Sequence, residues 1–267
     1  MSRLAFAVLF CAVLMLPTAA FAVDGQVLIN QATVMAAGGF PYKITQPGSY
    51  KLSGNLTVPA NTDGIDINAS HVTIDLNGFS IIGPQTCTGE PTAPVTSCTG
   101  SGFASGIVSI GNTAITIRNG SVTGMAGYGL LISAFGSLIE EVHASQNGIG
   151  IHGGRTIVRR CTAASNLHNG MEVQGVVENS IATNNGGDGI DLTDATATGN
   201  ASFFNANGIS ATQSTVANNM SFLNAQAGLS IDNTSTFRDN SLQGNGTDLQ
   251  NFGGASQKNN NCSGAVC

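Results

Sequence analysis

Tryptophan is absent from this chain, tyrosine occurs three times, and only 9% of the residues are charged. Sugar-binding platforms commonly present exposed aromatic side chains, so the scarcity of Trp and Tyr removes that signature. Lys and Arg number 9 against 15 Asp and Glu. Nucleic-acid binding depends on neutralising phosphates with basic side chains, so we expect no nucleic-acid partner.

Long hydrophobic runs are also missing, apart from residues 4–16. This run is shorter than the roughly 20 apolar residues that a membrane-spanning helix needs. Arg3 precedes it, Pro17 ends it, and the sequence AFA at 20–22 is typical of a signal-peptide cleavage site. We therefore predict a signal peptide at 1–22 cleaved after Ala22. The mature protein would be secreted or periplasmic, with no membrane span.

No Pro-rich or Ser-rich linker interrupts residues 23–267, which predicts a single domain. Five cysteines remain after cleavage. An exported protein can form disulfides, and Cys87, Cys98, Cys262 and Cys267 allow three connectivities, of which the local pairs 87–98 and 262–267 are the simplest. We expect Cys161 to be a buried free thiol.

An asparagine recurs every 19 to 21 residues through the second half of the chain. A second column lies five residues before it. Fixed-period similarity of this kind is typical of a solenoid. The two columns are Asn147, Asn166, Asn185, Asn205, Asn224 and Asn245, and Val142, Cys161, Ser180, Asn200, Asn219 and Asn240.

Each period contains two short alternating segments. The first follows a glycine, as in GMEV (170–173) and GIDL (189–192), and the second is centred on residues such as Val158 and Val177. An Asn or Asp precedes several of these glycines, and we expect these residues to be left-handed at a corner. We also expect Phe203, Phe204 and Phe222 to fill the core. The preceding residues in question are Asn147, Asn169, Asp188 and Asn207.

Three segments resemble bacterial right-handed parallel β-helix repeat proteins, relatives in fold of pectate lyases. They are ITQPGSYKLSGNL (44–56), VTIDLNGF (72–79) and IRNGSV (117–122). The resemblance covers nearly the whole mature chain. It implies an all-β, right-handed parallel β-helix. The repeat of about 20 residues predicts about nine or ten coils, and we expect an N-terminal cap at 23–43 and a disulfide-bonded loop. A shared fold does not transfer an activity.

Glu172 and Asp191 occupy the same outward position on neighbouring coils, with His152 and Gln174 expected in the next outward column. The pair could serve as a sugar-processing acid pair or a Ca²⁺ site, or it could be two solvated carboxylates. GGDGID (186–191) matches one calcium-binding unit. Such sites need stacked nine-residue repeats, so we expect no metal and no cofactor.

Basic and acidic residues alternate on successive second strands, at Arg118, Glu140, Arg159 and Glu178. Cross-strand ion pairs of this kind would give these arginines a structural role. Lyases of this fold often use an arginine beside their acids, so the lyase interpretation is less favoured. The catalytic motifs of polygalacturonase-like hydrolases and alginate epimerases are missing as well.

These observations favour a non-catalytic β-helix that binds a polysaccharide or cell-surface glycan, or another surface partner, along its outer face. The expected binding residues are His152, Glu172, Gln174 and Asp191. Two alternatives stay open. One is a polysaccharide lyase or glycoside hydrolase that uses Glu172 and Asp191. The other is a structural component of an envelope or matrix.

Overall fold

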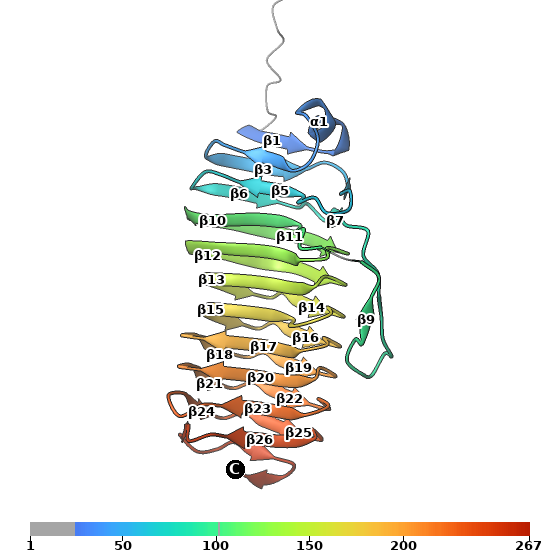
Figure 1. The fold of residues 1–267 in the computed structure, drawn as a ribbon. Helices are drawn as coiled ribbons and strands as arrows, with labels where there is room; N and C mark the ends of the chain where they lie inside the picture. The colour runs from blue at the N-terminus through green and yellow to red at the C-terminus, as the bar shows by residue number, and fades with distance from the viewer. Residues whose placement is uncertain (1–24, 101) are drawn as a thin grey trace, which may run out of the picture.

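The computed structural model describes residues 25–100 and 102–267, so the predicted signal peptide lies outside the described residues. Within them the chain forms one helix, α1 (Gln31–Ala36), and otherwise strands and turns. The strands stack in parallel into an elongated β-helix with three faces (Figure 1). No helix of the described residues is long and apolar enough to cross a membrane.

We name the three faces sheets A, B and C, in the order in which the chain visits them. Sheet A contains β2 (Tyr42–Ile44), β5 (Ile65–Ile67), β10 (Ile107–Thr113), the first parts of β12 (Tyr128–Ser145), β13 (Ile149–Arg159) and β15 (Met171–Glu178), then β17 (Asp188–Thr193), β20 (Asn207–Thr212), β23 (Ala227–Ile231) and β26 (Thr247–Asn251).

Sheet B follows after the first corner of each coil. It contains β1 (Gln26–Ile29), β3 (Gly48–Leu52), β6 (Val72–Asp75), the first part of β11 (Ile115–Thr123), later parts of β12, β13 and β15, then β18 (Thr196–Thr198), β21 (Thr215–Ala217), β24 (Thr236–Arg238) and β27 (Ala255–Ser256).

Sheet C completes the coil. It contains β4 (Leu56–Thr57), β7 (Ser80–Ile82), the ends of β11 and β12, β14 (Thr162–Ala164), β16 (Ile181–Thr183), β19 (Ala201–Phe203), β22 (Met220–Phe222), β25 (Ser241–Gln243) and β28 (Asn261–Cys262). β29 (Ala265–Val266) pairs antiparallel with β28 and ends the chain.

The solenoid has about 12 turns, slightly more than the nine or ten expected. The difference arises at the N-terminal end, where the repeat is irregular in sequence. Residues 23–43 were expected to form only a cap, but they already contribute β1 and β2 as paired rungs. The cap itself is α1, whose Val34 packs into the hydrophobic core.

The predicted asparagine column forms a hydrogen-bonded ladder inside the corner between sheets C and A. Oδ1 of Asn185 accepts from the backbone N–H and from Nδ2 of Asn166, at 3.1 and 2.8 Å. Nδ2 of Asn185 in turn donates to Oδ1 of Asn205 at 2.8 Å and to the carbonyl of Ala163 at 3.1 Å. The ladder ends where Asp248 accepts from Asn245. Buried polar groups at this corner are thereby paired.

The second column behaves in the same way at the corner between sheets B and C. Asn200, Asn219 and Asn240 bond in series, and Oδ1 of Asn260 accepts from the N–H of Asn240 at 3.1 Å. Cys161 stands in this column as a buried free thiol, as expected. Burial raises the pKa of its thiol to about 12, which makes it a poor nucleophile.

Two expectations about the corners and core were wrong. Left-handed conformations occur one residue before the ladder asparagines, as at Ser165 (φ 54°) and Asn184 (φ 58°), and not at the Asn or Asp residues before the glycines. Phe203 and Phe222 stack outside sheet C with ring centroids 4.9 Å apart, because the buried residue of each strand is the neighbouring serine, such as Ser202. Phe204, also placed in the core by sequence, is only partly buried.

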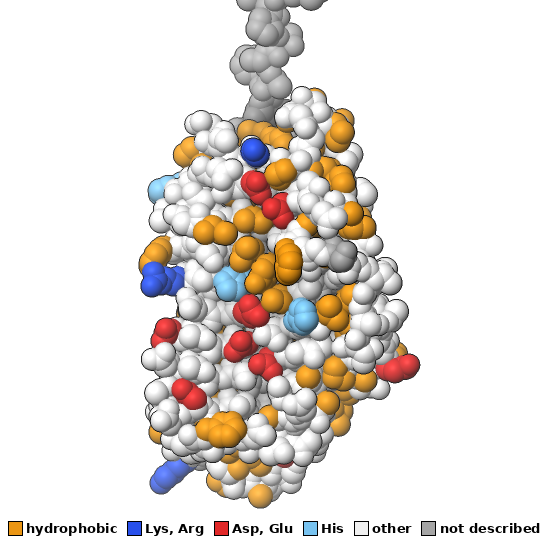
Figure 2. Space-filling model, viewed as in Figure 1, with side chains coloured by type: hydrophobic (Ala, Val, Ile, Leu, Met, Phe, Trp, Pro, Cys, Tyr) orange, Lys and Arg blue, Asp and Glu red, His pale blue; other side chains and the backbone are white. Residues whose placement is uncertain are grey.

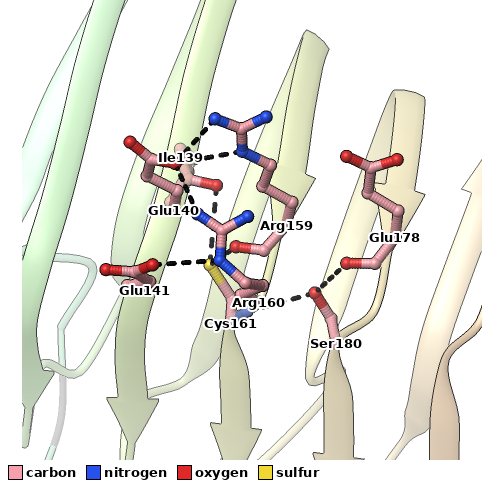
Figure 3. Close-up of polar contacts among 8 residues, drawn as sticks. All are labelled: Ile139, Glu140, Glu141, Arg159, Arg160, Cys161, Glu178 and Ser180. Atoms are coloured by element: carbon pink, nitrogen blue, oxygen red, sulfur yellow. Dashed lines mark hydrogen bonds and ion pairs between the residues drawn. The ribbon is translucent and has the colours of Figure 1, made fainter.

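The predicted charge column on sheet B is present in register (Figure 3). Arg159 pairs with Glu140 at 2.8 Å. Arg160, the next residue of the same coil, contacts Glu140 and Glu141, each at 2.9 Å. Arg118 pairs with Asp75 of the preceding coil at 3.4 Å. These arginines are therefore committed to ion pairs on sheet B.

Both local disulfides form, Cys87–Cys98 and Cys262–Cys267. The first closes a hairpin of β8 (Cys87–Thr88) and β9 (Ser97–Cys98), which runs beside sheet C in Figure 1. Nδ2 of Asn184 donates to three carbonyls of this hairpin, at 2.9 to 3.3 Å. The loop that the cysteines close is therefore docked onto the solenoid.

Replacing one ladder asparagine should strongly destabilise the protein. Asn185→Ala leaves the backbone N–H and one side-chain donor of Asn166 without their acceptor, and each buried unpaired donor costs about 1–3 kcal/mol. We expect a loss of about 3 kcal/mol in the free energy of unfolding, measured by urea denaturation. Asn233→Ala is the control, because this exposed side chain makes no hydrogen bond within the described residues. Equal stability of the two variants would contradict the ladder's role.

Candidate functional site

His152, Glu172 and Asp191 stand in one outward column of sheet A, on successive coils. The sequence interpretation placed His152 in the next column, and that was wrong. The coil of β13 has a glycine at both 148 and 150 before His152, and it is Gly150 that aligns with Gly170 of the following coil. His152 therefore lies directly beside Glu172, on the rung before it.

The carboxylate of Glu172 has a donor on each oxygen. Nδ1 of His152 lies 3.2 Å from Oε2, and Nδ2 of Asn169 donates to Oε1 at 3.1 Å. The ring of Tyr128 packs edge-on against the imidazole, with centroids 5.6 Å apart. Partial burial and the charge of Glu172 raise the pKa of the Tyr128 hydroxyl. The side chain of Glu172 is thus fixed by hydrogen bonds at both oxygens.

Asp191, in contrast to Glu172, lacks side-chain hydrogen-bond donors within the described residues, while Asp188 and Glu172 lie nearby. Burial, followed by the charges of Asp188 and Glu172, raises its pKa to about 6. Asn207 donates to Asp188 at 2.8 Å and so fixes that neighbour. Figure 2 shows acidic side chains in a line down this face, with histidines beside them.

A shallow groove of about 220 Å³ runs along this column. Gln174 lies at its edge, in register with Gly154 of the previous coil, and its exposed amide makes no hydrogen bond within the described residues. Two further grooves adjoin Gln174. One, of about 210 Å³, extends to Ser133 and Phe135 of an earlier coil, and the other, of about 550 Å³, continues around the corner to sheet B. Gln174 lines all three, so the grooves form one connected surface.

The largest of these hollows, which we call the corner groove, arises because one coil is short. Between Gly154 and Thr156 the coil of β13 has Arg155 as its corner residue. In the next coil Gln174 is followed directly by Gly175, with no corner residue. Gly175 has φ 130°, and a Cβ there would lie 2.5 Å from the carbonyl oxygen of Thr156, so this tight corner requires glycine.

Asp66 lies in the same outward column, nearer the N-terminus. Partial burial and the charge of Asp63 raise the pKa of its carboxyl, while Lys43 lowers it. It does not line the grooves described above. Among residues 25–100 and 102–267, no group of three or more His, Cys, Asp and Glu side chains is placed to hold a metal ion.

Sequence reasoning missed two aromatic residues and one corner residue of the site, namely Tyr128, Phe135 and Asp194. It left Arg155 unassigned at the turn near the acid pair. A signal for the corner was present, since the number of residues between the first and second strands of a coil is smallest at Gly175. That signal becomes visible only when the strands of each coil are aligned correctly.

The chain belongs to the family described as right-handed β-helix region, which matches residues 77–263. This confirms the expected hand and fold class. No curated protein sequence matches the chain.

Among solved structures, the Dettilon tailspike protein is similar over 87% of this chain, with a TM-score of 0.62 and 13% identity. The chain spans 57% of that protein's length. The A-module of mannuronan C-5 epimerase AlgE4 from Azotobacter vinelandii is similar over 84% of this chain and 73% of its own, with a TM-score of 0.50 and 17% identity. Both likenesses show the fold alone.

The pKa of Asp191 should be visible in the pH dependence of stability. Because its folded pKa is about 6 against an ordinary value of 3.8, the folded state binds the proton more tightly than the unfolded state. Stability is therefore lost as pH rises from about 4 through 6. We expect Asp191→Asn to be more stable than wild type at pH 7 and to lose that advantage below about pH 4, in unfolding experiments across pH. The control is Glu178→Gln on sheet B, which should not gain stability over wild type as pH rises from about 4 to 7. A difference in stability between Asp191→Asn and wild type that stays constant with pH would refute the raised pKa of Asp191.

Proposed function

We propose that this protein binds a polysaccharide along the outer face of sheet A, without cleaving it. The observation that carries the proposal is the connected run of grooves that His152, Gln174 and Asp191 share with the corner. A shallow polar groove with exposed hydrogen-bonding groups suits a chain of hydroxyl-bearing units. Tyr128 and Phe135 add aromatic surface beside these polar groups.

The charges of the groove favour a sugar ring without a carboxylate over the acidic column. The charges of Glu172 and Asp188 both act on Asp191, so this column is acidic. A uronate ring placed there would meet like charges, which is unfavourable. Sugar hydroxyls can instead donate to these carboxylates and accept from the amide of Gln174.

Binding is favoured over catalysis because His152 and Asn169 hold both oxygens of Glu172 in place, and the lone pairs that remain can accept from a ligand's hydroxyls. The nearest arginine to the acids along the groove, Arg155, lies on the ring of Phe135 at the corner, 4.2 Å from its centroid. One structural neighbour is named a mannuronan epimerase, which supports a polysaccharide as the class of ligand. Two disulfides are compatible with the proposed export to an oxidising compartment.

Cleavage of a polysaccharide is the second candidate, and one observation favours it. With a pKa of about 6, Asp191 can hold a proton near neutral pH, as a general acid must. Glu172 on the adjacent rung would then be the second carboxylate of an acid pair.

Calorimetric titration of the protein with a panel of neutral and anionic polysaccharides tests the proposal. We expect binding to at least one neutral glycan, weakened about tenfold or more by Glu172→Gln/Asp191→Asn, because charge-assisted hydrogen bonds are worth about 1.5–3 kcal/mol. Glu178→Gln, which removes a carboxylate from another sheet, should bind like wild type.

The same incubations are assayed for released sugar ends. Equal affinity of wild type and the double variant would reject sheet A as the binding face. Product release that stops in Asp191→Asn would replace the binding proposal with the catalytic one.

A further inference from the structure

Arg155 differs from the other arginines of the described chain. Arg118, Arg159, Arg160 and Arg238 each form an ion pair, whereas Arg155 forms none within residues 25–100 and 102–267. Its guanidinium lies over the ring of Phe135, 4.2 Å from the centroid. This contact fixes the planar group and leaves its N–H donors available. The corner groove thus contains an uncompensated, oriented positive charge.

The missing corner residue explains why this charge stays unpaired. Asp194 is the corner residue of the coil after the short one, and it lines the same groove from the opposite side. Two rungs separate Arg155 from Asp194, a spacing of about 9–10 Å for strands stacked 4.7–4.9 Å apart. No ion pair joins the two residues. An open notch therefore lies between a cation and an anion.

The floor of the notch is apolar. Ile157 and Val176 occupy neighbouring rungs of sheet B, and Ile157 is 43% exposed. A β-branched pair with Ile157 exposed and Val176 half-buried, beneath a fixed arginine, suits a ligand group with a short hydrocarbon part and a terminal anion. A purely polar substituent would not remove the apolar side chains of Ile157 and Val176 from contact with water.

The adjoining groove on sheet A restricts where that anion can be attached. Its acids Glu172, Asp188 and Asp191 disfavour a negative charge on the sugar ring itself. The distance from the His152 column to Arg155 is three residues along the chain, or about 10 Å of extended backbone. The anion must therefore be carried away from the ring, around the corner.

We infer that the corner groove binds a carboxylate carried on a short apolar arm of a sugar, such as a lactyl ether, while the ring lies over the sheet A groove. Arg155 receives the carboxylate, Ile157 and Val176 contact the arm, and Gln174 lies between the two. The inference rests on the proposed polysaccharide binding and narrows it to carboxyalkyl-substituted sugars, as distinct from uronic acids.

N-acetylmuramic acid and N-acetylglucosamine test this directly, because they differ only in the lactyl ether. Each is titrated into the protein at pH 7.5 and followed by NMR chemical shifts. We expect the lactyl sugar to bind about tenfold tighter or more, as one charge-assisted contact predicts. Glucuronic acid, whose carboxylate is on the ring, should bind no better than glucose.

Arg155→Gln should reduce the affinity for N-acetylmuramic acid to that for N-acetylglucosamine, and Arg155→Lys should retain part of the difference. Lys258→Gln removes an equal charge from an exposed site at the far end and should change nothing. Equal affinities for the two sugars in wild type, no binding of either, or insensitivity to Arg155→Gln would overturn the inference.

The neutral polysaccharide titration with Glu172→Gln/Asp191→Asn judges the proposed function separately. Retained polysaccharide binding without a lactyl preference removes only the corner inference. Lactyl binding that depends on Arg155, without any polysaccharide binding, supports the corner site and removes the sheet A proposal.

Discussion

The structure depends on satisfying backbone N–H groups inside the corners of each coil. A β-helix turns sharply three times per coil, and the N–H groups at these bends point into the core, where no water can reach them. The side-chain oxygen of a ladder asparagine on the next coil accepts such an N–H, as Asn185 does for Asn166. Because each bond joins equivalent residues of successive coils, the ladder also sets the register of all three sheets. The outward column of His152, Glu172 and Asp191 is a consequence of that register.

This dependence explains how much of the fold could be predicted from sequence. A ladder requires the same residue at the same place in every coil, so Asn147 to Asn245 were visible as a period, and the solenoid followed. The left-handed residues were not visible, because the requirement there is on backbone conformation, which Ser165, Asn184 and Phe204 can all meet while the ladder holds the next residue. The phenylalanines were misplaced for a related reason. In β19 the small Ser202 faces inward and donates to Gly208, so the larger neighbour Phe203 faces out.

The candidate site was predicted in part, and the limit again has a physical origin. Glu172 and Asp191 were paired correctly because their coils have the same pattern from glycine to carboxylate. His152 was placed in the wrong column because its coil has a glycine at both 148 and 150, and it is Gly150 that aligns with Gly170. The corner from sheet A to sheet B has no asparagine column, so coils can change length there. Variation is therefore concentrated at this corner, from Ser133–Ser137 in one coil to Gln174–Gly175 two coils later. The short corner, with its required Gly175, could not be located until the coils were aligned.

The surface charge also differs between the two sheets that meet at the corner from sheet A to sheet B. On sheet B, arginines and glutamates neutralise one another on adjacent rungs, so that face has little net field. In the sheet A groove, Glu172, Asp188 and Asp191 have no basic partner other than His152 among the described residues, and burial together with the charges of Asp188 and Glu172 raises the pKa of Asp191. Arg155 lies between these regions, stacked on Phe135. Asp194, the acid that shares its groove, stands two rungs away and forms no ion pair with it. A ligand that spans the corner therefore meets an acidic groove and then a single cation, and this order of charges selects neutral rings with a distant anion over rings that carry the anion themselves.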